Sequence, residues 1–202
     1  MKFNKTALNK IQKFWIWFSQ NCQSFGNNFE NTVLLDELDN KVTELGEFVW
    51  EVGPGKIADN ALVISPNGDL ELLPLTKEII ANSKECAGWE YYYAKPSKTW
   101  ELIFDFETTN EEQVQINASG WEYVLLGYED GMFEIILRAV NINGLNDDDK
   151  QTAAEILLDG VMGEELRMTT ICSIDVVWEF EEAYKNKSGN IRHLLNHINS
   201  LL

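Results

Sequence analysis

The stretch from Phe48 to Pro96 constrains the fold most, because it reads as strand, turn, strand, turn, helix and strand without interruption. Phe48, Trp50 and Val52 recur at every second position, which is the period of a half-buried strand. Gly53-Pro54-Gly55 is expected to end this strand, because proline donates no hydrogen bond and glycine permits positive φ. The rest of the chain is expected to add layers to this unit.

The remainder of the stretch carries equally local signals. The apolar run from Ala61 to Ser65 predicts a buried strand, and Ser65-Pro66-Asn67-Gly68 predicts a turn. Pro74 can begin a helix, since the N–H that proline lacks has no partner in a first turn. Trp89 and Tyr91 are expected to share one face of the next strand, opposite Glu90.

Two amphipathic helices are predicted before this unit, over residues 5–24 and 29–45. A short link between them indicates a helical hairpin over residues 1–46 that packs on the rest. In the first helix, Trp15 and Trp17 make more than one face apolar. Such a helix either lies between other elements or presents aromatic side chains to a partner, and packing against the sheet is the favoured interpretation.

The second half alternates strands and helices. Strands are predicted over residues 100–106, 121–128, 132–140 and 168–180, a loop over 108–113, and helices over 147–162 and 189–202. Asp130-Gly131 is a strong hairpin signal, and Ser188 can cap the last helix. The whole pattern predicts one α+β domain over residues 1–202, with a largely antiparallel sheet covered by helices. Residues 132–180 are expected to form one βαβ crossover.

Composition limits the partners and the compartment. The 202 residues carry a net charge of −17, which opposes binding to nucleic acid or to an anionic membrane surface and favours solubility or a basic protein partner. Three widely separated cysteines without a CxxC motif indicate reduced thiols. No signal-peptide pattern is evident, and no run reaches the roughly 18 apolar residues of a membrane span. A cytoplasmic location is therefore expected.

Motifs for catalysis or metal binding give little indication of function in this sequence. His193 and His197 lie four residues apart on a predicted helix, but no third ligand is near in sequence, so no metal is expected. The aspartates at 147–149 suit the first turn of a helix better than a calcium loop. No GxSxG or GxxxxGK[ST] motif is present, and we expect no catalytic residues and no cofactor.

Four residues are the candidates for binding: Trp15, Trp17, Glu90 and Asp175. Asp175 stands between two apolar residues of a predicted strand. A covered strand face would demand an arginine partner, Arg138 or Arg167, and would perturb the pKa of the carboxyl group. An open sheet face is the favoured interpretation.

The strings FWIWF, WEVGPG and LVISPNGD, at residues 14–18, 50–55 and 62–69, resemble those of a family of uncharacterised bacterial proteins of similar length. In that family an aromatic helix precedes a strand with a glycine-proline turn, followed by a strand ending in I-S-x-x-G. The resemblance covers roughly the first half of the chain. It implies this fold and a bacterial cytoplasmic location, and it carries no catalytic residues.

Charge, aromatic content and the absence of catalytic signatures favour a non-enzymatic protein-interaction module, such as an inhibitor, an immunity-type protein or an adaptor. The alternative is a small enzyme or ligand-binding domain that uses carboxylates and aromatic side chains in a cleft of the sheet.

Overall fold

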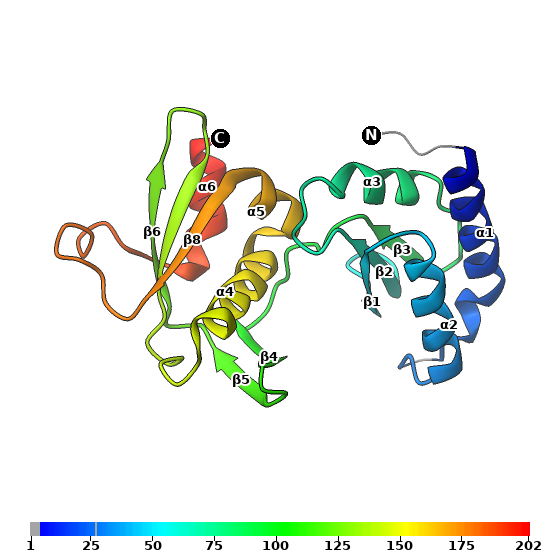
Figure 1. The fold of residues 1–202 in the computed structure, drawn as a ribbon, viewed down its shortest axis with the longest axis horizontal. Helices are drawn as coiled ribbons and strands as arrows, with labels where there is room; N and C mark the ends of the chain where they lie inside the picture. Colours follow the sequence, from blue (N-terminus) through cyan, green and yellow to red (C-terminus); the bar gives the residue numbers. More distant parts are fainter. Residues whose placement is uncertain (1–4, 27) are drawn as a thin grey trace. The chain divides into compact units, whose positions relative to one another are not determined.

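The computed structural model describes residues 5–26 and 28–202, so residues 1–4 of the predicted hairpin and Asn27 lie outside the described residues. The α+β class is confirmed (Figure 1). The chain forms two compact units, Met1–Lys95 and Pro96–Leu202, where the sequence predicts one domain. The described residues contain three sheets, so the prediction of a single sheet is wrong.

The elements of the first unit are α1 (Lys5–Asn21), the 3-10 helix η1 (Cys22–Ser24), α2 (Thr32–Thr43), β1 (Val49–Pro54), β2 (Asn60–Ser65), α3 (Leu73–Ala81) and β3 (Trp89–Tyr92). The strand order is β1-β2-β3, with β1 antiparallel and β3 parallel to β2. The β2–α3–β3 segment is therefore a parallel crossover that the sequence analysis did not predict. Strand β1 ends at Pro54, which confirms that Gly53-Pro54-Gly55 ends this strand, and Pro54–Asn60 is the last pair of the β1–β2 ladder.

Both predicted helices pack on this sheet. Their inner faces share one hydrophobic core with β2, α3 and β3, which confirms the packed helical hairpin within the described residues. Aromatic rings dominate the core. The ring centroids of Trp15 and Tyr91 lie 4.7 Å apart, those of Phe18 and Trp89 lie 5.0 Å apart, and both pairs pack edge to face. The predicted second helix begins three residues late, because the Asn31 side chain caps it.

A disulfide joins Cys22, the first residue of η1, to Cys86, in the loop before β3. The prediction of reduced thiols is wrong for this pair. The fold brings together two residues that are 64 positions apart, and their Cα atoms lie 6.7 Å from one another. Cys172 is a free cysteine and is exposed.

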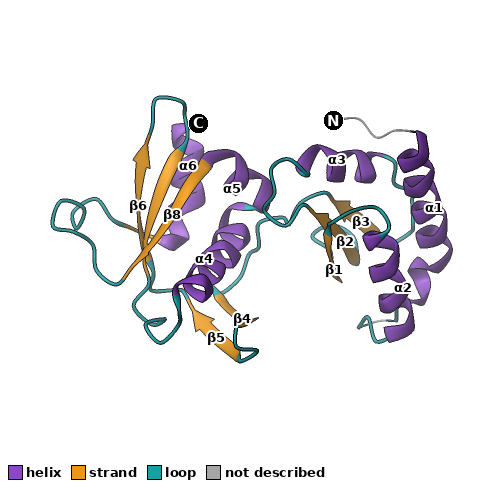
Figure 2. Cartoon of the chain, viewed as in Figure 1, coloured by secondary structure: helices purple, strands orange, loops and turns teal. Residues whose placement is uncertain are grey.

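The second unit begins with two β-hairpins, the second of which belongs to a mixed sheet, and its helices follow later in the chain (Figure 2). Its elements are β4 (Ile103–Glu107), β5 (Gln113–Asn117), β6 (Glu122–Gly127), β7 (Phe133–Arg138), α4 (Asp147–Met162), α5 (Glu164–Thr170), β8 (Ile171–Val177), β9 (Gly189–Asn190), η2 (Ile191–His193) and α6 (Leu194–Leu201). Strands β4 and β5 form a sheet of their own. The other sheet has the order β8-β7-β6-β9, with β8 parallel to β7.

Several predictions about this unit are confirmed. The β6–β7 hairpin turns at Gly131, and the β7–α4–α5–β8 segment is the expected crossover. One face of the mixed sheet packs against α4 and α6 in a continuous core. Helix α5 takes the place of the start of the predicted strand over 168–180. Asn190, rather than Ser188, caps η2, the 3-10 helix that leads into α6.

Candidate functional site

Two of the four candidate residues lie in the core region of the first unit. Trp15 is fully buried, and its indole N–H donates to the Ile79 carbonyl at 2.8 Å. Trp17 is half-buried, and its N–H donates to the Glu37 carboxylate at 3.0 Å while Lys41 lies over its ring. Trp15 therefore presents no surface to a partner, and Trp17 offers only part of its ring.

Glu90 fastens the loop between β1 and β2. Its carboxylate accepts hydrogen bonds from three successive backbone N–H groups, those of Lys56, Ile57 and Ala58, and from the Tyr92 hydroxyl. Burial would raise the pKa of Glu90, but these hydrogen bonds favour the ionised form and hold the pKa below its ordinary value. The Glu90 carboxylate on β3 thus serves the fold of the first unit, because it ties the β1–β2 loop to β3.

Asp175 lies on β8, in the second unit, and is exposed. The open-face interpretation is confirmed, since Arg138 pairs with Glu122 and Arg167 pairs with Asp159 instead. The structure does not gather the four candidates into one site: three belong to the first unit, where each makes separate contacts, and Asp175 stands on a different sheet. Their binding roles stay predictions.

The surroundings of Asp175 form an open strand edge. Strand β8 is the outermost strand of its sheet, and β7 is its one strand partner among the described residues. None of the seven residues of β8 is buried, whereas four of the six residues of β7 are. A long edge strand in this state presents unpaired backbone groups to any approaching chain.

The hydrogen bonds identify which groups are unpaired. The Val177 carbonyl accepts from the Ala139 N–H at 3.0 Å, so the backbone groups of Val177 point toward β7. Because these groups alternate in direction along a strand, those of Ile174 and Val176 point away from β7. The side chains of Ile174 and Val176 still pack against the core, which fixes the edge in place.

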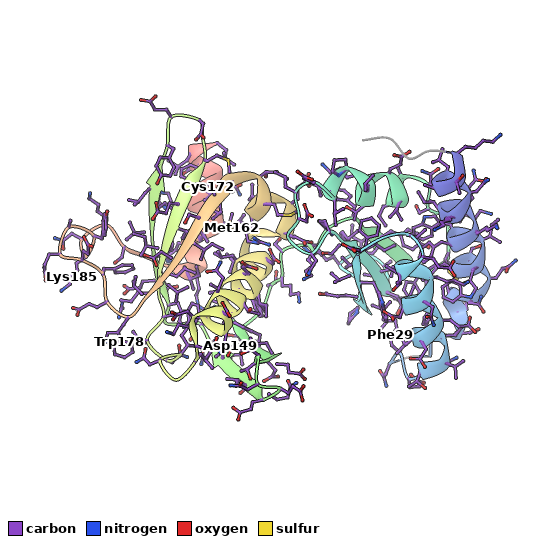
Figure 3. All side chains as sticks on the ribbon, viewed as in Figure 1. Phe29, Asp149, Met162, Cys172, Trp178 and Lys185 are labelled. Atoms are coloured by element: carbon purple, nitrogen blue, oxygen red, sulfur yellow. A yellow bond between two sulfur atoms is a disulfide. The ribbon has the colours of Figure 1, made fainter. Side chains whose placement is uncertain are left out.

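A large aromatic side chain ends this edge. Trp178 directly follows β8 and is 56% exposed (Figure 3). The segment 171–182 carries four carboxylates and no lysine or arginine. We call β8, which includes Asp175, together with Trp178 the β8 edge. It combines unpaired backbone groups, an exposed tryptophan and negative charge.

The loop that follows the β8 edge is ordered by its own contacts. Phe180 is buried in a small cluster with Val124 and Ile136 on the second face of the sheet. Lys185 pairs with Glu179 at 2.9 Å and with Glu182 at 2.6 Å. Hydrogen bonds to Lys185, together with its positive charge, lower the pKa of Glu179. Trp178 therefore lies between β8 and a loop that has contacts of its own.

Sequence reasoning missed Trp178 as a surface residue. Trp178 lies within the predicted strand 168–180, two and four residues after Val176 and Ile174, so strand alternation places it on their side of the sheet. Strand β8 ends at Val177, however, and the alternation ends with it. The signal that could have identified it is the Glu179, Glu181 and Glu182 run, which is more typical of a surface loop than of a strand.

The histidines have structural partners. The Nδ1 atom of His197 lies 2.9 Å from the Tyr123 hydroxyl. Within residues 5–26 and 28–202, no three His, Cys, Asp or Glu side chains converge in a way that could hold a metal ion. No helix in the described part of the chain has the length and apolar character needed to cross a membrane.

Comparisons with protein-family models, with curated proteins and with solved structures find no significant match for this chain.

Proposed function

We propose that this chain is a non-enzymatic protein-interaction module whose partner adds an extended, basic segment alongside β8. The observation that carries the proposal is the β8 edge itself: a seven-residue outer strand, with no residue buried, that ends at an exposed tryptophan. Strand addition to an open sheet edge is a recurring mode of peptide recognition, in which backbone hydrogen bonds provide affinity.

The chemistry of the partner follows from the side chains of the edge. Asp175 and Glu181 favour lysine and arginine and disfavour acidic segments, whereas Glu179 and Glu182 already pair with Lys185. Trp178 is a residue type that often contributes much of the binding energy at an interface, provided that the partner covers it. The partner is therefore expected to place an apolar group over Trp178 and cations near Asp175.

The cytoplasmic location and the bacterial family resemblance belong to the proposal as well. The Cys22–Cys86 disulfide is more typical of an oxidising compartment. The binding proposal does not depend on the compartment in which the protein is found, because the disulfide lies in the first unit and the β8 edge in the second.

Two substitutions at Val176 separate backbone pairing from side-chain packing. Val176→Ala and Val176→Pro both lose the packed side chain, but only proline also removes the outward N–H. We expect a stoichiometric partner, captured from native lysate by the unmodified chain, to be retained by Val176→Ala and lost by Val176→Pro. Purified partner and isothermal titration calorimetry then give the affinities.

Side-chain variants provide the second arm. Trp178→Ala and Asp175→Lys should each weaken binding. The binding that remains in Asp175→Lys should depend less on salt concentration than that of the unmodified chain. Ile57→Ala is the control, because Ile57 is 94% exposed but lies in the first unit. The proposal fails if no partner binds stoichiometrically, or if a captured partner binds Val176→Pro and Trp178→Ala as well as it binds the unmodified chain.

A further inference from the structure

A small cleft lies within the second unit, between the segment before β4 and the helices that close the core. Its volume is about 270 Å³. Its lining residues are half apolar and half polar: Lys98, Thr99, Trp100, Leu102, Val161, Arg192, Leu195 and Asn196. No carboxylate lines this cleft, although the chain as a whole carries 33 acidic residues.

The cations of the second unit distinguish this cleft from the rest of its surface. Residues 96–202 contain seven lysines and arginines. Four of them pair with carboxylates, namely Arg138, Lys150, Arg167 and Lys185. Lys187 lies over the Tyr184 ring. The two that remain, Lys98 and Arg192, form no ion pair within the described residues, and both line the cleft.

Backbone contacts fix the main-chain positions of Lys98 and Arg192. The Lys98 N–H donates to the Gly160 carbonyl of α4 at 2.7 Å. The Arg192 N–H donates to the Asn190 side chain at 3.0 Å, and its guanidinium lies 3.5 Å from the Glu101 carbonyl. That last contact is weak, so most of the guanidinium donors are left for another acceptor. The cleft therefore has two positive groups on an ordered base.

The apolar wall is equally well defined. The Trp100 ring lies against Gly160 and 5.7 Å from the Phe104 ring. Its indole N–H is buried and has no hydrogen-bond partner in the part of the chain that the structure describes. Leu102, Val161 and Leu195 complete the wall. An apolar body thus has a place beside the cationic groups.

We infer that this cleft is a binding site for a small organic anion, one that carries a carboxylate or phosphate group on a flat apolar body. Arg192 and Lys98 would bind the anionic group, Asn196 would supply an amide donor, and the body would pack on Trp100. The small volume excludes a large cofactor and suits a ligand with a single ring. The site is separate from the β8 edge and does not depend on the proposed function.

Three probes test the inference on the full chain by isothermal titration calorimetry and by NMR shifts of backbone amides. Phenyl phosphate and benzoate combine the two required features and differ in the anionic group. Benzylamine has the same body with a positive charge. We expect one or both anions to bind saturably, with shifts at residues 98–102 and 192–196, and benzylamine not to bind. The stronger of the two anions identifies the preferred group.

Neutral variants locate the site. Arg192→Gln and Lys98→Gln should each weaken anion binding about tenfold, the usual effect of losing a charge-assisted hydrogen bond. Lys187→Gln removes an equal charge elsewhere on the same unit and should leave the affinity unchanged. Thermal unfolding confirms that each variant is folded. The inference is overturned if neither anion saturates, if benzylamine binds as well, or if Lys187→Gln weakens binding as much as Arg192→Gln.

Discussion

At the scale of single residues, the Glu90 carboxylate links the β1–β2 loop to the titration of a tyrosine. Burial and then the hydrogen bond to Glu90 raise the pKa of Tyr92 to about 12. Burial and then the charge of Glu85 raise the pKa of Tyr91 to about 12. A raised pKa means that the folded chain holds the phenol proton more tightly. The associated stabilisation is complete below the ordinary value of 10.0 and is lost as the pH rises through about 12.

Glu90→Gln should therefore lower the pKa of Tyr92 toward its ordinary value, by less than the whole shift, because burial is the larger cause and remains. Tyr91 should still titrate near 12, which provides a control within the same molecule. NMR titration of isotope-labelled tyrosine rings measures both. An unchanged Tyr92 in the variant would show that its hydroxyl does not contact Glu90 in solution.

Gly160 is a second residue whose role depends on one neighbour. Alanine in the middle of a helix is usually about 1 kcal/mol more favourable than glycine. A Cβ atom at Gly160, however, would lie 2.4 Å from Cζ2 of Trp100. We expect Gly160→Ala to lower the free energy of unfolding by about 1–3 kcal/mol through overpacking.

Denaturant unfolding measures this loss, and a double variant identifies its cause. Trp100→Leu removes the ring, so Gly160→Ala in that background should no longer destabilise the chain and should show the usual helical preference for alanine. Equal losses in the two backgrounds would mean that the Trp100 ring is not the obstacle.

At the scale of elements, local patterns predicted most helices and strands, while pairings between distant segments escaped prediction. In the predicted strand 100–106, Leu102, Phe104 and Phe106 recur at every second position, and all three are buried. The polar strand β5 was not predicted, because it carries only a weak alternation in which Val114 and Ile116 are the apolar residues. Nothing local to β2 and β3 states that they pair in parallel across α3, because that pairing depends on tertiary packing.

The candidate site shows the same division. The exposed position of Asp175 agrees with the open-face interpretation of its strand, which was made from the strand's own residues. The crossover expected over residues 132–180 adds a parallel pair at one edge of the sheet, and β8 does lie there beside β7, but the lack of any buried residue in β8 depends on tertiary packing. The cleft beside Trp100 is less predictable still, since its cations are 94 positions apart in sequence (98 and 192).

The Cys22–Cys86 disulfide is an element-scale constraint, because it fixes the start of η1 to the loop that leads into β3. Closing a loop across 64 residues should stabilise the fold by about 4 kcal/mol, chiefly through the entropy of the unfolded chain. We expect Cys86→Ser to lower the free energy of unfolding by about this amount in oxidising buffer. Denaturant titrations of both proteins measure the difference.

The reducing condition and the third cysteine supply the controls. With a reductant that opens the bond, the unmodified chain and Cys86→Ser should have nearly equal stability. Cys172→Ser should have little effect in either buffer, since Cys172 is exposed and unbonded. If Cys86→Ser were as stable as the unmodified chain under oxidising conditions, the disulfide would not form in solution.

At the scale of the whole molecule, the chain has separate hydrophobic cores. The core of the first unit draws on α1, α2 and the β1-β2-β3 sheet, and the main core of the second draws on β4 to β8, α4 and α6. Composition could not reveal this, because the hydrophobic content of 45% is the same whether it fills one core or two. Nor does any glycine- or proline-rich linker mark the boundary near Lys95.

Separate cores predict separate folding. Fragments 1–95 and 96–202 are each within the usual size range of a domain, and each contains its own core, so both should fold when expressed alone. We expect dispersed amide NMR spectra and cooperative thermal unfolding from each. Fragment 96–202 contains the whole β8 edge and the whole Trp100 cleft, and it should bind an anionic probe with the affinity of the full chain. A fragment that gives a collapsed spectrum without a cooperative transition would instead support the single domain that the sequence predicts, because a unit that needs its neighbour in order to fold is not an independent domain.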